Sequence, residues 1–294
     1  MKKLTKLALA FLFIVGLSSC GANNNSQPAN TNEASPEETD VAVEPTPANE
    51  TGDVIRIGVV GENNEVWEEV IKRYEAGTGK KAELVRFADY TQPNEALSSG
   101  DIDVNSFQHY KYLEEYNTAT GSDLVAIGDT MLAPLGLYSS QITSLDELED
   151  GARIAIPNDP SNGSRALFLL QAAGLITVEG NAGETITLAE ITDNPKNLEF
   201  IEMDASQTPR SLDDVTAAVV NDNYALDAGL KPNQDAVYLE DPNNPDVKQY
   251  INVIATRKAD ENNEAYKELV SYYQTDETKK DYDTYTDGAW IPSW

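Results

Sequence analysis

The sequence predicts an α/β fold made of two lobes, with a ligand cleft between them. Short β-branched runs alternate along residues 53–294 with segments whose apolar residues recur at helical spacing, a pattern typical of sheets covered by helices. The alternation forms two blocks of about a hundred residues each, and no repeat with a period of roughly 20–50 residues indicates a solenoid. Since small-molecule sites gather beyond the carboxyl ends of parallel strands, we expect a site between the blocks.

The first block contains short strands and two helices. The helices, over 63–76 and 109–116, are predicted from apolar residues at helical spacing, and Gly77 and Gly79 are stop signals for the first one. The predicted strands are short apolar runs at 54–60, 82–87, 101–107, 124–127 and 131–138.

The second block opens with a strand over 153–157 that leads into a helix. Asp159 or Ser161 can cap this helix, which is expected over 160–173 and stops at Gly174. The remaining elements are predicted strands at 198–202, 217–220, 236–239 and 251–256, followed by a helix at 262–274.

The N-terminus has the layout of a cleaved lipoprotein signal peptide, residues 1–19. Three lysines precede an apolar run over 7–17, which is far shorter than the about 20 residues that a spanning helix needs. The run ends in Leu-Ser-Ser-Cys, which resembles the bacterial lipobox and implies diacylglyceryl attachment to Cys20. The alternative is an ordinary secretory peptide with an incidental cysteine. Lipid attachment would place the protein on the extracytoplasmic face of the cell membrane, anchored and not spanning.

Residues 20–52 are expected to form a disordered tether behind the lipid. The stretch after Cys20 has no lysine, arginine or aromatic residue and is rich in Asn, Pro, Glu and Thr, so it cannot bury enough apolar surface to fold. The formal net charge of -29 argues against nucleic acid or anionic lipid as partners, since both attract clusters of Lys and Arg.

Composition excludes several kinds of catalytic site. Cys20 is the single cysteine and His109 the single histidine, so a Cys-His pair and an ordinary zinc site are excluded and no free thiol remains. The chain has no G-x-S-x-G elbow and no phosphate-binding glycine loop. We therefore expect a binding protein without metal, cofactor or catalytic residues. A lipid-anchored hydrolase that uses carboxylates and a surface adhesin remain the alternatives.

Four segments carry distinctive motifs. They are FADYTQPNEAL at 87–97, GDIDVNSFQHYKYL at 100–113, IPNDPSNGSRAL at 156–167 with LQAAGL at 170–175, and NPKNL at 194–198 continuing through ASQTPRSLDD at 205–214 to AVVNDNYAL at 218–226. Together they closely resemble the NlpA/MetQ family of methionine-binding lipoproteins, and the match extends from about 54 to 294 with motif order and spacing preserved.

This resemblance implies a type II-like periplasmic-binding-protein fold whose chain crosses between lobes twice. Lobe I would comprise 53–139 plus 250–294, and lobe II would comprise 140–249. The implied function is to capture methionine, L-methionine foremost, and to deliver it to the permease and ATPase of an ABC importer. A monomer is expected. Another small apolar amino acid or a methionine dipeptide is the alternative ligand.

Three polar residues match ligand contacts of the family. Arg165, in the first turns of a predicted helix, can grip a carboxylate with two parallel hydrogen bonds, although a surface arginine would look the same in the sequence. Asn221 and Asn252 stand at strand ends, where an amide can serve both the carboxylate and the ammonium of an amino acid. Each could otherwise be a turn residue.

Four ring-bearing residues match the family's side-chain pocket: Tyr90, Phe107, His109 and Tyr112. Aromatic rings suit a thioether, at about 0.3–1.5 kcal/mol per contact with sulfur, but rings at this spacing more often belong to a core than to a site. The chain departs from the common family pattern at Lys111 and Ser164. Glu65 and Trp67, which both lie in the segment that follows the first strand, are further candidates for the site.

Overall fold

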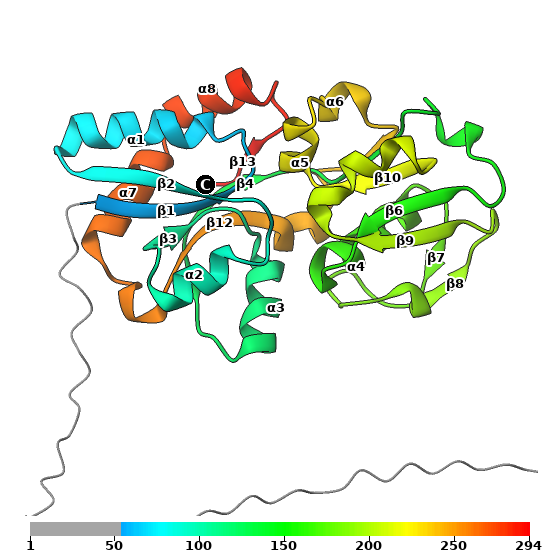
Figure 1. Ribbon diagram of the computed structural model, residues 1–294, viewed down its shortest axis with the longest axis horizontal. Coiled ribbons are helices and arrows are strands. Elements are labelled where there is room, and N and C mark those ends of the chain that lie inside the picture. The colour runs from blue at the N-terminus through cyan, green and yellow to red at the C-terminus, as the bar shows by residue number, and fades with distance from the viewer. Residues whose placement is uncertain (1–53) are drawn as a thin grey trace, which may run out of the picture. The chain divides into compact units, whose positions relative to one another are not determined.

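The computed structural model describes residues 54–294, which form two lobes, each built around its own sheet (Figure 1). The expected signal peptide at 1–19, the lipidated Cys20 and the tether at 20–52 lie outside the described residues. Within residues 54–294, no helix is both long and apolar enough to cross a membrane.

Lobe I contains a six-stranded mixed sheet in the order β13-β4-β12-β3-β1-β2. The β1 strand pairs in parallel with both β2 and β3, whereas β12 and β13 run antiparallel to their neighbours. The strands are β1 Val54–Val60, β2 Lys81–Phe87, β3 Val104–Asn105, β4 Val125–Leu132, β12 Ile251–Thr256 and β13 Ile291–Pro292.

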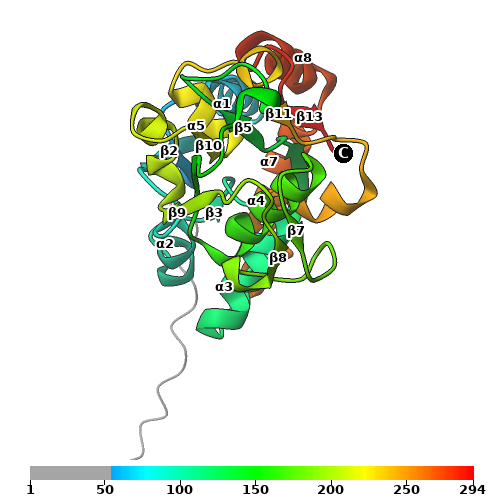
Figure 2. The ribbon, with the colours of Figure 1, turned by 90° about the vertical axis from the view of Figure 1, so that its right-hand side faces the viewer.

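Helices cover both faces of the lobe I sheet, as Figures 1 and 2 show. Alternate residues of β1, beginning with Ile55 and Ile57, pack with α1, α7 and α8, while Leu97, Leu113 and Val253 form a core with α2 and α3 on the other side. This alternation is the period of two that a strand imposes. The helices are α1 Glu65–Thr78, α2 Pro93–Ser99, α3 Tyr110–Thr120, α7 Glu264–Tyr273 and α8 Asp276–Tyr285.

Lobe II contains a five-stranded sheet in the order β11-β5-β10-β6-β9, with a separate two-stranded ribbon formed by β7 and β8. The strands are β5 Gly136–Tyr138, β6 Arg153–Pro157, β7 Thr177–Val178, β8 Ile191–Asp193, β9 Glu199–Met203, β10 Ala217–Val220 and β11 Tyr238–Leu239. The helices are α4 Pro160–Ala172, α5 Asp222–Asp227 and α6 Pro232–Asp235.

Six short 3-10 helices connect these elements. They are Leu145–Glu147, Leu188–Glu190, Ala205–Gln207, Pro209–Asp213, Pro245–Tyr250 and Lys258–Asp260. Four of them lie between β5 and β10 in the sequence, so lobe II contains more irregular backbone than the sequence pattern indicates.

The first crossing between lobes comes earlier than expected. The expected boundary at 139 places 136–138 in lobe I, but β5 pairs with β10 and β11 in the lobe II sheet. That assignment was wrong, because the apolar run at 131–138 is two strands separated by residues 133–135 and not one. The second crossing lies between β11 and β12, which belong to different sheets.

Most predicted elements are present. The cap of α4 is one of the two residues predicted for it, since Asp159 accepts a hydrogen bond from the backbone N–H of Asn162. The predicted strand over 101–107 shrinks to two residues in β3, because the residues before it form bends. The sequence pattern did not predict α2, α5, α6 and α8, or the strands β7, β8 and β13, which are short or mostly polar and have weak apolar periodicity. Of these, α5 contributes to the site.

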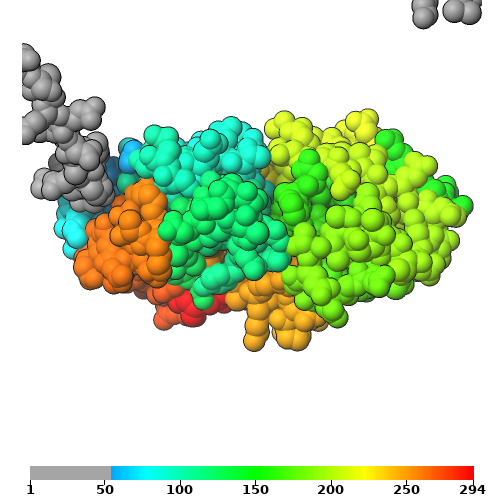
Figure 3. Space-filling view, turned by 90° about the horizontal axis from the view of Figure 1, so that it is seen from below, coloured from blue at the N-terminus to red at the C-terminus, as the bar shows by residue number. Residues whose placement is uncertain are grey.

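The lobes pack against each other through a shared apolar cluster at the base of the cleft. Val60 and Phe87 of lobe I meet Tyr138, Val220 and Tyr224 of lobe II there. Figure 3 shows the two lobes in contact on one face of the molecule, where the green and yellow residues of lobe II meet the teal and orange residues of lobe I. The cleft is therefore closed, and groups from both lobes can meet inside it.

Candidate functional site

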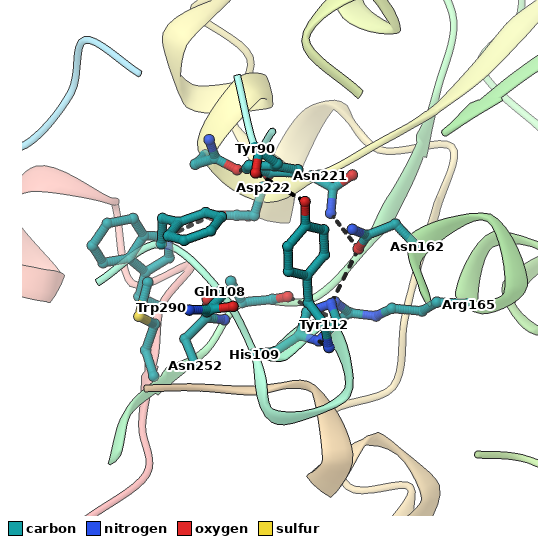
Figure 4. Close-up of a pocket in the computed structure, with 14 residues that line it drawn as sticks. Tyr90, Gln108, His109, Tyr112, Asn162, Arg165, Asn221, Asp222, Asn252 and Trp290 are labelled. Atoms are coloured by element: carbon teal, nitrogen blue, oxygen red, sulfur yellow. Dashed lines mark hydrogen bonds between the residues drawn. The ribbon is translucent and has the colours of Figure 1, made fainter. Parts of the chain in front are cut away.

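All seven residues expected at the ligand site line one pocket between the lobes (Figure 4). The internal space of the pocket is small, about 40 Å³. Its lining consists of Tyr90, Phe107, Gln108, His109, Tyr112, Met131, Ala133, Asn162, Arg165, Asn221, Asp222, Asn223, Asn252 and Trp290.

The polar groups converge because strands of both sheets end at the cleft. His109 follows β3, Asn162 follows β6, and Asn221 follows β10 directly. β10 and β6 are parallel, so their carboxyl ends lie at the same edge of the sheet. From lobe I, the segment at 107–109 is held against β12, where the backbone N–H of Val253 donates to Gln108 O at 2.9 Å.

Three aromatic rings form one wall of the pocket. The ring centroids of Tyr90, Phe107 and Tyr112 lie 5.7–5.9 Å apart in pairs, in tilted or edge-to-face arrangements. The Tyr112 hydroxyl donates to Tyr90 O at 2.9 Å, and the Tyr90 hydroxyl donates to Asn223 Oδ1 at 2.5 Å in the other lobe. This wall is preorganised, with its hydroxyl groups already paired and its faces and edges left for apolar contact.

His109 is a buried neutral imidazole. Its Nδ1 accepts from the backbone N–H of Tyr112 at 3.0 Å and thereby caps α3, so Nε2 carries the proton. Burial, reinforced by the nearby positive charge of Arg165, lowers the pKa of His109 to about 3. The Nε2–H group lies 3.2 Å from Asn162 Oδ1, and this hydrogen bond crosses from lobe I to lobe II.

Asn162, which sequence reasoning did not place in the site, joins the polar groups of the two lobes. Its Oδ1 also accepts from Asn221 Nδ2 at 2.8 Å, and its Nδ2 donates to Asp159. Figure 4 shows this chain of hydrogen bonds from His109 through Asn162 to Asn221. Its position three residues before Arg165, in the first turn of the same helix, was the available signal.

Arg165 is buried, with 3% of its surface exposed, and its guanidinium group is already largely committed. Nε and Nη2 donate to the two carboxylate oxygens of Glu240 at 3.0 and 2.5 Å, and Nη2 also donates to Ala133 O. Burial opposes the positive charge, but Glu240 outweighs it and the pKa of Arg165 is raised. The alternative of a surface arginine was wrong. The planar edge expected for the ligand is occupied by Glu240, and Nη1 is the guanidinium nitrogen that donates no hydrogen bond within residues 54–294.

Asp222 and Trp290 are two pocket residues that sequence reasoning missed. The indole Nε1 of Trp290, in lobe I, donates to Asp222 Oδ2, in lobe II, at 2.6 Å. Asp222 directly follows Asn221, which was predicted to lie in the site. In the sequence, however, it is one of fifty acidic residues and has no feature that distinguishes it from the others. Trp290 lies near the C-terminus, and its place in the pocket depends on how β13 pairs with β4.

The two further candidates after the first strand do not reach this pocket. Glu65 is the first residue of α1 and is absent from the lining. Trp67 is buried in the lobe I core, where its ring stacks at 4.6 Å on Tyr273. It lines a neighbouring cavity that shares Phe107 and Trp290 with the main pocket.

A second, wider groove of about 450 Å³ follows the lobe boundary near Gly61, Arg86, Arg210 and Asp227. Its arginines are exposed, whereas the polar groups of the main pocket are buried. Buried, convergent polar groups give a site its specificity, so the main pocket is the better candidate. Within the part of the chain that the structure describes, no group of three or more acidic, histidine or cysteine side chains is arranged to hold a metal ion.

Comparison with known proteins gives the same family as the sequence motifs do, and the match covers nearly the whole folded part of the chain. The chain is 43% identical over 243 residues to the D-methionine-binding lipoprotein MetQ of Escherichia coli K12, which covers 82% of this chain and 88% of the relative.

Two solved structures are also similar. A nutrient-binding protein from Burkholderia cenocepacia bound to methionine is 43% identical with a TM-score of 0.78, over 82% of this chain and all of that one. The substrate-binding protein of a methionine transporter from Streptococcus pneumoniae is 38% identical with a TM-score of 0.77, over 83% of this chain and 96% of that one. The family model for NlpA lipoproteins matches residues 55–294, and the chain therefore belongs to the NlpA lipoprotein family.

Proposed function

We propose that this protein is a solute-binding lipoprotein that encloses methionine between its lobes and delivers it to an ABC importer. The observation that carries the proposal is the meeting of an aromatic wall and buried polar groups from both lobes in one closed pocket. Relatives described as methionine-binding proteins support the choice of ligand.

The pocket matches the three chemical parts of methionine. The wall of Tyr90, Phe107 and Tyr112 would hold the thioether chain, whose full burial is worth about 1.5–3 kcal/mol. Arg165 Nη1 and the amide of Asn252 would bind the carboxylate. His109 would stand beside the ligand as a neutral hydrogen-bonding group, since its ring is uncharged at neutral pH.

Lipid attachment at Cys20 would hold the folded part at the extracytoplasmic face of the membrane, close to the permease and its ATPase. We infer that residues 20–52 act as the tether and that the carrier works as a monomer. The alternative ligands within this fold are another small apolar amino acid and a methionine dipeptide.

Two other functions are less well supported. A hydrolase that used the single histidine as a base would need a serine beside it, yet His109 hydrogen bonds to Asn162 and to the backbone of Tyr112. An adhesin binds its partner through exposed surface, and polar groups that are buried around a pocket between the lobes would not contact such a partner. No turnover on ester, peptide and glycoside panels, together with saturable binding of a small molecule, is the expected result.

A thermal-shift panel tests the ligand assignment. Full-length protein in detergent, unfolded and refolded to remove any bound ligand, would be mixed with L-methionine, D-methionine, norleucine, glycyl-methionine, glutamate and lysine. A ligand at a hundredfold excess over its Kd stabilises the folded state by about 2.7 kcal/mol, which shifts the midpoint by about 5–10 °C. Methionine should shift it most and norleucine less, because norleucine lacks the sulfur. A shift by glycyl-methionine alone would make the substrate a peptide, and no shift at all would remove the methionine assignment.

A further inference from the structure

Asp222 is the one carboxyl group among the residues that line the pocket, and only one of its two oxygens has a hydrogen-bond partner in the described part of the chain. Its side chain is 3% exposed. Oδ2 accepts the indole N–H of Trp290 at 2.6 Å, but Oδ1 is buried and has no hydrogen-bond partner within residues 54–294. A buried acceptor without a donor is destabilising, and more so if it is charged.

A second unpaired acceptor belongs to the neighbouring residue. Asn221 donates through Nδ2 to Asn162, while its Oδ1 is buried and has no partner in the described part of the chain. Both residues line the pocket, and Figure 4 draws them side by side at its edge. Two unpaired acceptors on consecutive residues of the lining, one of them a carboxylate oxygen, suit a group that donates several hydrogen bonds and carries positive charge.

The cations near Asp222 do not satisfy it. Arg165, on α4, is the positive charge that acts on Asp222, and its Nε and Nη2 are held by Glu240. His109, before α3, is neutral because burial lowers its pKa to about 3. From β5, the buried Tyr138 phenol adds no charge, since burial raises its pKa above its ordinary value. Burial accordingly raises the pKa of Asp222 to about 7, although Trp290 and Arg165 oppose this.

We propose that Asp222 Oδ1, together with Asn221 Oδ1, receives the α-ammonium group of the ligand and makes the pocket select amino acids over the corresponding carboxylic acids. This inference rests on the proposed function and assigns the part of the ligand that Arg165 and Asn252 do not bind. Trp290 fixes the carboxylate from the opposite lobe, so the receptor is complete only when the lobes are closed.

The receptor predicts that ligand binding releases a proton near neutral pH. An ammonium group favours the ionised carboxylate, so Asp222 must lose its proton when the ligand enters. Between pH 6 and pH 8, across the value of about 7 for the pKa of Asp222, methionine affinity should therefore rise by about tenfold.

The test compares methionine with 4-(methylsulfanyl)butanoate, which is methionine without its amino group, by calorimetry on the full-length protein in detergent. Wild type should prefer methionine by about 10- to 100-fold, the value of a hydrogen bond between charged groups. Asp222→Asn should weaken methionine binding by a similar factor, bind the deaminated analogue no worse and lose the pH dependence. Asp213→Asn, an exposed residue of the same lobe, is the matched control and should change neither affinity.

Two further measurements separate the explanations. Trp290→Phe removes the tie to Asp222, so it should weaken both ligands but preserve most of the preference for methionine. If Asp222→Asn weakens both ligands equally and keeps the preference, Asp222 only ties the lobes together and the inference is wrong. Proton release is measured on wild type alone, in buffers of different ionisation enthalpy, and its absence near pH 7 would also overturn the inference. If wild type binds no methionine at all, the proposed function fails first and this inference with it.

Discussion

Gly61 and Asp227 lie against each other across the boundary between the lobes, and a side chain at Gly61 would collide with the carboxylate of Asp227. The carboxylate accepts the backbone N–H groups of Glu62 and Asn63, at 3.1 and 3.0 Å. These two residues precede α1 in lobe I, whereas Asp227 ends α5 in lobe II. The contact therefore exists only in the closed arrangement, and its strength contributes to how tightly the cleft stays closed.

Gly61→Ala should therefore weaken ligand binding by favouring the open cleft. Gly61 has φ of 84°, so alanine there is strained and its Cβ also meets Asp227. Gly100→Ala is the matched control, because Gly100 has φ of 85° with nothing within 4 Å of a new Cβ. Both variants should lose stability, but only Gly61→Ala should lose affinity and show a wider particle in small-angle scattering with ligand present. Equal affinities of the two variants would contradict a closing role for this contact.

Asp227→Ala removes the same contact without backbone strain. We expect methionine affinity to fall by about fivefold, since the two hydrogen bonds are partly exposed and worth about 1 kcal/mol. The loss should come mainly from faster dissociation, measured by stopped-flow fluorescence. An unchanged dissociation rate would show that the lobes are held closed by other contacts.

Arg165→Ala should destabilise the fold as well as the site. Its partner Glu240 would remain buried without its cation, and removing one member of a buried pair costs about 3–5 kcal/mol. Denaturant unfolding measures this loss. Lys80→Ala is the control, because the Lys80–Glu268 pair is equally short at 2.6 Å but exposed, and such pairs contribute about 0–1 kcal/mol. If Arg165→Ala has the same free energy of unfolding as wild type, burial of Glu240 does not need the positive charge of Arg165.

His109 should make the protein sensitive to acid. Its pKa is lowered from 6.5 to about 3 in the folded state, so the neutral ring stabilises the fold above about pH 6.5 and this contribution is lost as pH falls toward 3. From pH 7.5 to pH 4.5 the loss is about 2–3 kcal/mol. Chemical denaturation of wild type and His109→Asn over this range checks it, because the variant should lose less stability on acidification. Parallel curves would mean that His109 is not buried as a neutral group.

Cys20→Ser tests the anchor, which lies outside the described residues. Without the thiol no diacylglyceryl group can be attached, and the protein should leave the membrane fraction while its midpoint shift with methionine stays the same. Immunoblots of membrane and soluble fractions give the answer. A variant that remains with the membrane would show that something other than a lipid on Cys20 holds it there.

Local pattern and motif spacing in the sequence determined much of this protein. The β-branched run at β1 and the apolar face of α1 predicted both elements, because burial on one face imposes a period of two or 3.6 residues. The aspartate that caps α4 was one of the two caps predicted from the local sequence, the other being Ser161. All seven expected site residues line one pocket. Six of them come after parallel strands that end at the cleft, whereas Asn252 lies at the start of β12.

Only the tertiary structure decided how these groups are paired. Glu240 occupies the edge of Arg165 that was expected to face the ligand, and 75 positions separate the two residues. Asp222 and Trp290 meet across 68 positions and two lobes. The apolar run at 131–138 is divided between two sheets. Periodicity reports which face of an element is buried but not which distant residue lies against it, because such contacts depend on how the sheets pack and how the lobes close.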